Sequence, residues 1–141
     1  MKKLIVLTSL IFALITQTLD VNKVEIENNK LNVNGIEYFI KGVCYDPVPI
    51  GKTVRSFNTI DKDLLLMQEA GINTIRVYSP IDDLAILNKI DEAGIKVITS
   101  FGYNQNGYYD ILNGTYLDYI NKYKNHNAIL LWELGNEYNY H

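Results

Sequence analysis

The sequence predicts an α/β fold in which parallel strands alternate with helices. Three observations support this prediction: helix and strand patterns alternate after residue 58, the strands between the helices are largely apolar, and a Glu-Ala-Gly-Ile joint occurs at residues 69–72 and again at 92–95. Each helix must stop sharply before the chain re-enters the sheet, so glycine releases the backbone and isoleucine begins the next buried strand. Repeated β/α units with a parallel sheet follow from this pattern.

The composition is that of a globular protein with a weakly acidic charge balance. The chain has 141 residues, 13 Lys or Arg and 16 Asp or Glu, which gives a formal net charge of -3. Nucleic acid and anionic membrane surfaces are bound by clustered Lys and Arg, so we expect neither as a partner. The length is about half of the roughly 250 residues that a closed barrel of eight β/α units needs.

The first 18 residues differ from the rest of the chain. Lys2 and Lys3 precede an apolar run at residues 4–15, and polar residues follow at 16–18. This order is typical of a secretory signal peptide, and the run is shorter than the about 20 residues of a membrane-spanning helix. We therefore expect residues 1–18 to be a signal peptide, residues 22–141 to form the folded part, and the protein to be secreted or periplasmic without membrane attachment after cleavage. An N-terminal membrane anchor is the alternative.

Short alternating strands are expected before the first β/α unit. Apolar and polar residues alternate from Val24 to Ile40, and Asn28-Asn29 and Asn34-Gly35 supply the residues that tight hairpin turns require. A short β-hairpin should therefore lead into a strand at residues 39–44, whose apolar character is expected of a strand covered on both faces. Cys44, the only cysteine, should be small and buried there, without a partner to activate it as a nucleophile.

Three helices are expected, each with a capping residue at its start. Asn58, Ser79 and Thr115 are the candidate N-caps, with Asp82 completing a capping box in the second helix, and Gly71 ends the first helix as Gly94 ends the second. The apolar faces should be Ile60, Leu64, Met67 and Ala70 in the first helix, Leu84, Leu87 and Ile90 in the second, and Leu117, Ile120 and Tyr123 in the third.

Buried strands are expected between these helices, at residues 73–78, 96–100 and 128–132, which makes four parallel strands with residues 39–44. This alternation fits either a closed barrel or an open doubly wound sheet. No glycine-rich phosphate loop follows any strand, which weakens the nucleotide-binding form of the open sheet. The long connection at residues 102–114 follows a strand, and that end of the strands is the functional end of a parallel barrel.

The segment that ends the fourth strand is the most informative for function. It reads Trp132-Glu133-Leu134-Gly135-Asn136-Glu137, and Asn-Glu at this place resembles the acid/base signature of clan A glycoside hydrolases, the retaining β-glycosidases built on TIM barrels. Residues 124–137 look like the block before the acid/base in glycoside hydrolase family 2. Residues 39–43 and 71–78 are similar to the first two strands of the clan. Family 72, which transglycosylates β-1,3-glucan, and family 5 are close alternatives.

This resemblance implies a (β/α)8 TIM barrel of which the sequence holds about the first four β/α units, preceded by the short hairpin. It makes Glu137 the general acid/base, Asn136 the side chain that binds the sugar 2-hydroxyl, and Arg76 a residue that orients the nucleophile. The nucleophile of the clan follows the seventh strand, so we expect these 141 residues to be an N-terminal half that is not active alone. The expected function is exported, retaining hydrolysis of β-linked oligo- or polysaccharide; a β-glucan transglycosylase or a non-catalytic carbohydrate-binding half-barrel is the alternative.

Structural readings of the same residues remain open. Glu137 could be a favourable acid near a helix N-terminus, and Asn136 a turn residue. Arg76 interrupts an apolar strand, where an unpaired charge is costly, so it must meet a carboxylate. If that carboxylate is not the nucleophile, Asp46 and Glu133 are the candidates for a structural ion pair.

Tyrosine is over-represented, with 11 residues against one Trp and four Phe. Several tyrosines follow strand ends, where a flat ring with a hydroxyl can stack on a sugar: Tyr103, Tyr108, Tyr109, Tyr138 and Tyr140. Tyr103 is the strongest candidate for sugar binding and Tyr138 a second one, with packing at the barrel rim as the alternative. His126 and His141 lack a third ligand, so we expect no metal and no cofactor.

An isolated half-barrel would leave strand edges unpaired. The first and fourth strands would each expose one edge, and Val77, Ile98 and Leu131 would face water in the barrel interior. We therefore expect the half-barrel alone to self-associate.

Overall fold

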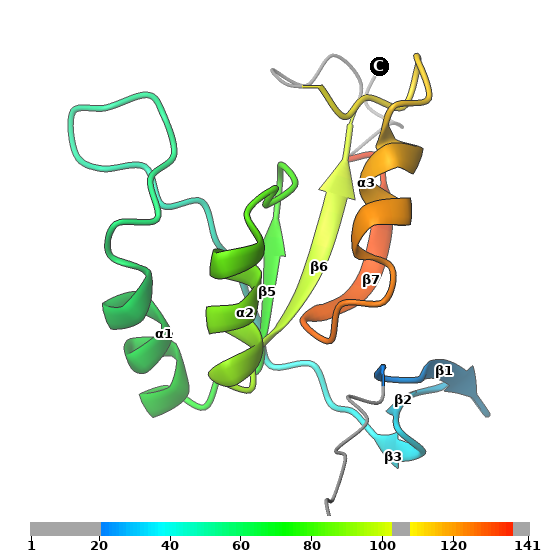
Figure 1. Ribbon diagram of the computed structural model, residues 1–141. Helices are drawn as coiled ribbons and strands as arrows, with labels where there is room; N and C mark the ends of the chain where they lie inside the picture. The colour runs from blue at the N-terminus through cyan, green and yellow to red at the C-terminus, as the bar shows by residue number, and fades with distance from the viewer. Residues whose placement is uncertain (1–20, 103–107, 137–141) are drawn as a thin grey trace, which may run out of the picture.

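The computed structural model describes residues 21–102 and 108–136, which form two sheets and three helices (Figure 1). The main sheet is parallel and consists of β4 (Gly42–Cys44), β5 (Thr74–Val77), β6 (Lys96–Phe101) and β7 (Ile129–Leu134). Its connections contain α1 (Ile60–Glu69), α2 (Leu84–Glu92) and α3 (Tyr116–Tyr123). A smaller antiparallel sheet of β1 (Val24–Glu27), β2 (Lys30–Val33) and β3 (Ile36–Glu37) precedes them. The predicted alternation of strand and helix is confirmed.

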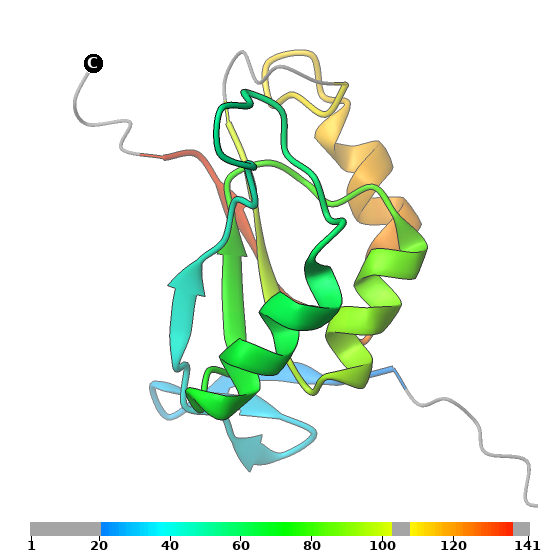
Figure 2. The ribbon, with the colours of Figure 1, turned by 90° about the vertical axis from the view of Figure 1, so that its left-hand side faces the viewer.

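Successive strands of the main sheet are added at the same edge. Its strand order is β4-β5-β6-β7, so each strand pairs with the strand before it in the chain. Figure 2 shows all three helices on one side of this sheet. A doubly wound sheet has helices on both faces, so the described units are arranged as in a β/α barrel.

The two Glu-Ala-Gly-Ile joints have the same conformation. Gly71 and Gly94 have φ values of 72° and 71°, the left-handed region that favours glycine. In both joints the isoleucine that follows donates its N–H to the carbonyl five residues earlier, at 2.9 and 3.1 Å. These bonds form the Schellman motif, so both helix ends were predicted correctly.

The predicted starts of the first two helices were wrong. The N-cap of α1 is Thr59 rather than Asn58, and that of α2 is Asp83, whose carboxylate accepts two backbone N–H groups at 2.9 and 3.3 Å. Ser79 cannot begin α2 because the chain first carries Ile81 into the core, where its side chain is 1% exposed. The helix starts only after that excursion.

The buried face of α3 also differs from the expected one. Thr115 is its N-cap, as predicted, but makes no side-chain capping bond to the helix. Tyr119 and Tyr123 are buried, whereas Leu117 is 49% exposed. The Tyr119 hydroxyl donates to the Ile81 carbonyl at 2.9 Å, so a large side chain fits inside with its polar end satisfied. Similarly, Leu84 and Ala70 lie on the exposed sides of their helices.

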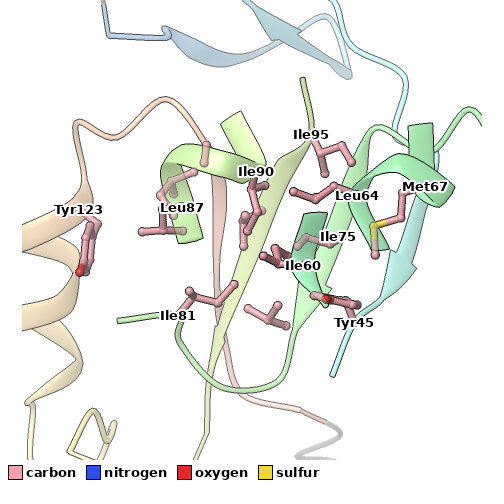
Figure 3. Packing of buried hydrophobic residues seen from close by; sticks show 14 of the residues in the cluster. Tyr45, Ile60, Leu64, Met67, Ile75, Ile81, Leu87, Ile90, Ile95 and Tyr123 are labelled. Carbon is pink, nitrogen blue, oxygen red and sulfur yellow. The ribbon is translucent and has the colours of Figure 1, made fainter. Parts of the chain in front are cut away.

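The core lies between the helices and one face of the main sheet. Figure 3 shows Ile60 and Leu64 of α1 and Ile90 of α2 close to Ile75 of β5. Val77 belongs to this core and is 0% exposed, so its expected place in the barrel interior was wrong. Side chains alternate along a strand, and Val77 shares the helix-facing side with Ile75. Ile98 and Leu131 are paired across β6 and β7 on the other, helix-free face, and both are only partly buried.

The strand β4 is exposed, contrary to the expectation of cover on both faces. All three of its residues, including Cys44, are exposed. The reason is its place at the edge of the main sheet, with the helix-free face on one side. The prediction that Cys44 is buried was therefore wrong.

The antiparallel sheet lies at the amino ends of the parallel strands (Figure 1). Asn28-Asn29 and Asn34-Gly35 form its turns, with φ values between 50° and 76° as the predicted hairpin turns require. Asn22 donates two hydrogen bonds to Asn127, from its backbone N–H to Oδ1 at 2.8 Å and from its side-chain amide to the backbone carbonyl at 3.0 Å. The Tyr38 hydroxyl donates to the backbone carbonyl of Asn73, just before β5, at 2.7 Å. These contacts attach the small sheet to the amino ends of the parallel strands, opposite their carboxyl ends.

The edge position of β4 generates a prediction about the isolated polypeptide. We expect the 141-residue chain, produced alone, to dimerise or aggregate, because β4 and β7 are the edge strands of the sheet that the structure describes. Sedimentation velocity checks this. Val43→Lys, on the exposed edge strand, should reduce the association, whereas Leu117→Lys, on the exposed side of α3, should not. A wild-type chain that is monodisperse and melts cooperatively as a monomer contradicts the prediction.

Candidate active site

Polar side chains gather at the carboxyl ends of β5, β6 and β7, on the helix-free face of the sheet. They are Arg76 from β5, Ser100 from β6, Glu133 from β7 and Asn136 just after β7. In parallel β/α folds this end of the strands holds the functional residues. Of the five candidate site residues, the structure brings Arg76 and Asn136 together.

The centre of the cluster is a two-point ion pair between Arg76 and Glu133. Arg76 Nε donates to Glu133 Oε2 at 2.6 Å, and Arg76 Nη2 donates to Glu133 Oε1 at 2.7 Å. The planar guanidinium matches the carboxylate in this geometry, which makes such pairs strong and directional. The Ser100 hydroxyl also donates to Glu133 Oε2. Of the two acids considered for a structural pair with Arg76, the structure shows Glu133 and not Asp46.

Asn136 is connected to the same guanidinium. Arg76 Nη2 donates to Asn136 Oδ1 at 2.9 Å. Gly135, which links the strand to Asn136, has a φ of 97°, and its N–H donates to the Phe101 carbonyl at 2.7 Å. A residue with a Cβ is strained at that φ, which explains the glycine between the strand and Asn136.

The register of β6 against β7 brings the site residues onto one face. Val97 pairs with Ile129, but Ile98 pairs with Leu131, so β7 has one extra residue at this irregularity. As a result Ser100 stands opposite Glu133. The irregularity is a β-bulge in effect, a feature that re-aims side chains next to functional sites.

The charges of the pair stabilise each other. Hydrogen bonding from Arg76 lowers the pKa of Glu133 below its ordinary range, against the opposing effect of burial. Hydrogen bonding to Glu133 likewise raises the pKa of Arg76. Both groups are therefore charged at neutral pH, and the pair as a whole is neutral.

Cys44 and Tyr78 adjoin the guanidinium of Arg76. The Tyr78 hydroxyl donates to Cys44 Sγ at 3.4 Å, and the Tyr78 ring lies 4.5 Å from Arg76 Cζ. The hydrogen bond from Tyr78, followed by that from Arg76, lowers the pKa of the Cys44 thiol. Cys44 was predicted to lack an activating partner, but Arg76 lies opposite it in the register of β4 and β5.

A hollow of about 360 Å³ opens beside these residues. It is lined by Ile40, Gly42, Val43, Cys44, Thr74, Arg76 and Ile98. A larger hollow of about 540 Å³ lies on the other side of the sheet edge, between α1 and the loop after β4, and Arg76 does not line it. Asp46 and Asp63 line the larger hollow, whereas the smaller one is lined by Arg76, whose guanidinium could orient a polar ligand.

Asp82 is a second polar centre, although it was predicted to be a helix-capping residue. It instead accepts side-chain hydrogen bonds from Tyr109 at 2.7 Å, Tyr123 at 2.8 Å and Lys122 at 2.6 Å. Burial acts to raise the pKa of Asp82, but these three donors together outweigh it and lower that pKa. The Tyr109 hydroxyl is thus directed to Asp82, which favours the packing alternative for this tyrosine.

The remaining candidate site residues lie outside the described part of the chain. These are Glu137, Tyr103 and Tyr138, together with Tyr140. Their roles stay predictions from the sequence. Tyr108 is described; it is 65% exposed, and its hydroxyl donates to Asp118 at 2.9 Å.

In the described part of the chain, residues 21–102 and 108–136, no three or more His, Cys, Asp or Glu side chains come together in a group that could hold a metal ion. None of its helices has the length and apolar character needed to cross a membrane. The described groups at the carboxyl ends of the strands are thus an ion pair, hydroxyls, a thiol and an amide.

A family model and several named proteins are similar to this chain. Residues 24–116 match the family model described as "Glycosyl hydrolases family 2, TIM barrel domain". A beta-galactosidase of Lactococcus lactis is 25% identical over 138 residues, which cover 89% of this chain and 14% of that protein. A 1,3-beta-glucanosyltransferase of Saccharomyces cerevisiae is 33% identical over 125 residues, covering 74% of this chain and 26% of the yeast protein.

A solved structure agrees with these relatives. The GH2 beta-galacturonidase from Eisenbergiella tayi, bound to galacturonate, superposes with a TM-score of 0.66 and 25% identity, covering 82% of this chain and 23% of that one. The chain therefore spans only 14% to 26% of the length of these three proteins.

The lowered pKa of Glu133 predicts how stability depends on pH. The ion pair stabilises the folded chain fully above the unfolded pKa of about 4.3, and this stabilisation is lost as the pH falls through the lower folded value. We expect Glu133→Gln to unfold at lower urea concentration than wild type at pH 7. The difference should shrink on acidification below about pH 4. A difference that stays constant from pH 7 to pH 3 contradicts the assignment.

Proposed function

The chain belongs to the glycosyl hydrolases of family 2, within the TIM-barrel domain of that family, and from this we propose that it carries the acid/base part of the active site of a β-glycosidase. The substrate class that we propose is β-linked oligo- or polysaccharide. One observation carries the proposal: Arg76 holds the amide of Asn136 at the carboxyl ends of the strands, and Glu137 is the next residue.

In the proposed mechanism Glu137 acts twice. It first donates a proton to the glycosidic oxygen that leaves, and then accepts a proton from the water that completes the reaction. The Asn136 amide binds the sugar 2-hydroxyl, a contact that strengthens in the transition state. Binding and proton transfer thus come from adjacent residues of the sequence.

Retention of configuration needs a second carboxylate, about 5 to 5.5 Å from the first. We assign it, by family resemblance, to the end of a seventh barrel strand. The proposal therefore concerns the activity of the protein in which this segment occurs together with the other strands of its barrel. These two relatives are about four and about seven times as long as the part that this chain matches, which is consistent with that assignment.

A β-glucan transglycosylase is the second candidate, because the yeast relative is 33% identical and carries that name. The two functions share the acid/base and differ in the acceptor, which is water in one and a sugar hydroxyl in the other. Incubation with β-1,3-glucan oligomers separates them: longer oligomers indicate transfer, and a rise in reducing ends indicates hydrolysis. Sugar binding without either product indicates a non-catalytic module.

We predict that Glu137→Gln in the whole protein lowers kcat on unactivated β-glycosides by about 100-fold or more, because the leaving oxygen loses its proton donor. Steady-state kinetics with β-galactosides and β-glucans checks this. Glu92→Gln is the matched control, since Glu92 is an exposed residue at the far end of α2. Equal activity of Glu137→Gln and wild type removes Glu137 from the acid/base role.

We also propose that the protein is exported, with residues 1–18 as its leader. Leu10 lies within the apolar run of that segment, so Leu10→Arg should leave uncleaved precursor inside the producing cell. Cell fractionation with N-terminal sequencing measures this. Equal export of Leu10→Arg and wild type contradicts the leader assignment.

A further inference from the structure

Glu133 determines the direction of the other N–H groups of the Arg76 guanidinium, those that do not donate to Glu133 itself. The guanidinium is planar, and its two bonds to the Glu133 carboxylate fix that plane. Nη2 has two N–H groups, of which one donates to Glu133 Oε1 and the other to Asn136 Oδ1. The direction of the second N–H is therefore a consequence of the first contact.

The pair is held from several sides. Ser100 of β6 donates to the Glu133 carboxylate, and the Tyr78 ring lies against the guanidinium at 4.5 Å. Arg76 and Glu133 are 22% and 32% exposed at their side chains, so neither is free in solvent. Three strands thus fix a geometry that a surface ion pair would not keep.

The contact also selects one orientation of the Asn136 amide. Because Oδ1 accepts from Arg76, the Nδ2 group is the end left to donate to a ligand. An amide without this contact can turn by 180° and present its oxygen instead. We propose that Glu133 is a positioning residue, which acts through Arg76 to present the Asn136 amide as a donor to the sugar 2-hydroxyl; this rests on the function proposed above.

A purely structural role would give a different result. The Lys96–Asp91 pair is comparable, at 2.9 Å and with side chains 14% and 32% exposed, but it lies at the opposite end of β6. Asp91→Asn is therefore a matched control for Glu133→Gln. Both variants remove one charge from a partly buried pair, and only Glu133 touches the guanidinium that binds Asn136.

The first measurement is selectivity for the 2-hydroxyl. kcat/KM is measured in the whole protein for 4-nitrophenyl β-D-galactopyranoside and for its 2-deoxy counterpart, and the ratio of the two is independent of how much of the preparation is folded. We expect Asn136→Ala to lose the preference for the 2-hydroxy substrate and Glu133→Gln to reduce it by about tenfold, the value of one hydrogen bond. Asp91→Asn should keep the wild-type ratio. A wild-type ratio in Glu133→Gln overturns the proposal.

The second measurement needs no turnover. In ¹⁵N-labelled protein, the side-chain amide signals of Asn136 should be resolved and slowly exchanging in wild type and Asp91→Asn, and averaged to those of a free amide in Glu133→Gln. Unchanged signals in Glu133→Gln overturn the positioning role even if the enzyme is active. If wild type cleaves no β-glycoside, the proposed function fails, and the amide signals still decide whether Glu133 orients Asn136.

Discussion

The alternation of side chains along β5, β6 and β7 is the constraint on which both the core and the candidate active site depend. In β5, Ile75 and Val77 face the helices and are fully buried, while Arg76 between them faces the other side. Because the side-chain period of a strand is two residues, a slip of one residue would exchange these faces. Burial of the two aliphatic side chains therefore fixes Arg76 where it meets Glu133.

Much of the fold could be predicted from the sequence because its signals are local. The joints at Gly71 and Gly94 require only a glycine and the residues beside it, and the hairpin turns require only adjacent asparagines and a glycine. The helix starts were less predictable, since the start of α2 depends on the burial of Ile81, a tertiary effect. The exposure of Cys44 was mispredicted for a similar reason, because an apolar run does not show whether its strand lies at a sheet edge.

The site was predictable in kind and not in detail. An arginine in an apolar strand predicts that a carboxylate partner exists. Which carboxylate it is, here Glu133, depends on the register between strands that are far apart in the sequence. The extra residue of β7 sets that register, and nothing local marks it. The abundance of tyrosine indicated sugar binding, but several tyrosines have structural roles. Tyr119 fills the core, and the hydroxyls of Tyr109 and Tyr123 donate to Asp82. The ring and hydroxyl that suit a sugar also suit a packed interior with a nearby acceptor.

The sequential strand order has a consequence for synthesis on the ribosome. Each parallel strand pairs with the one made just before it, so a β/α unit can dock on the growing sheet as soon as its own residues have emerged. No strand of the described sheet pairs with a strand that is distant in the sequence. The entropic cost of closing each loop is therefore that of one helix and its two connections. Nascent chains of this architecture can therefore bury their helices early.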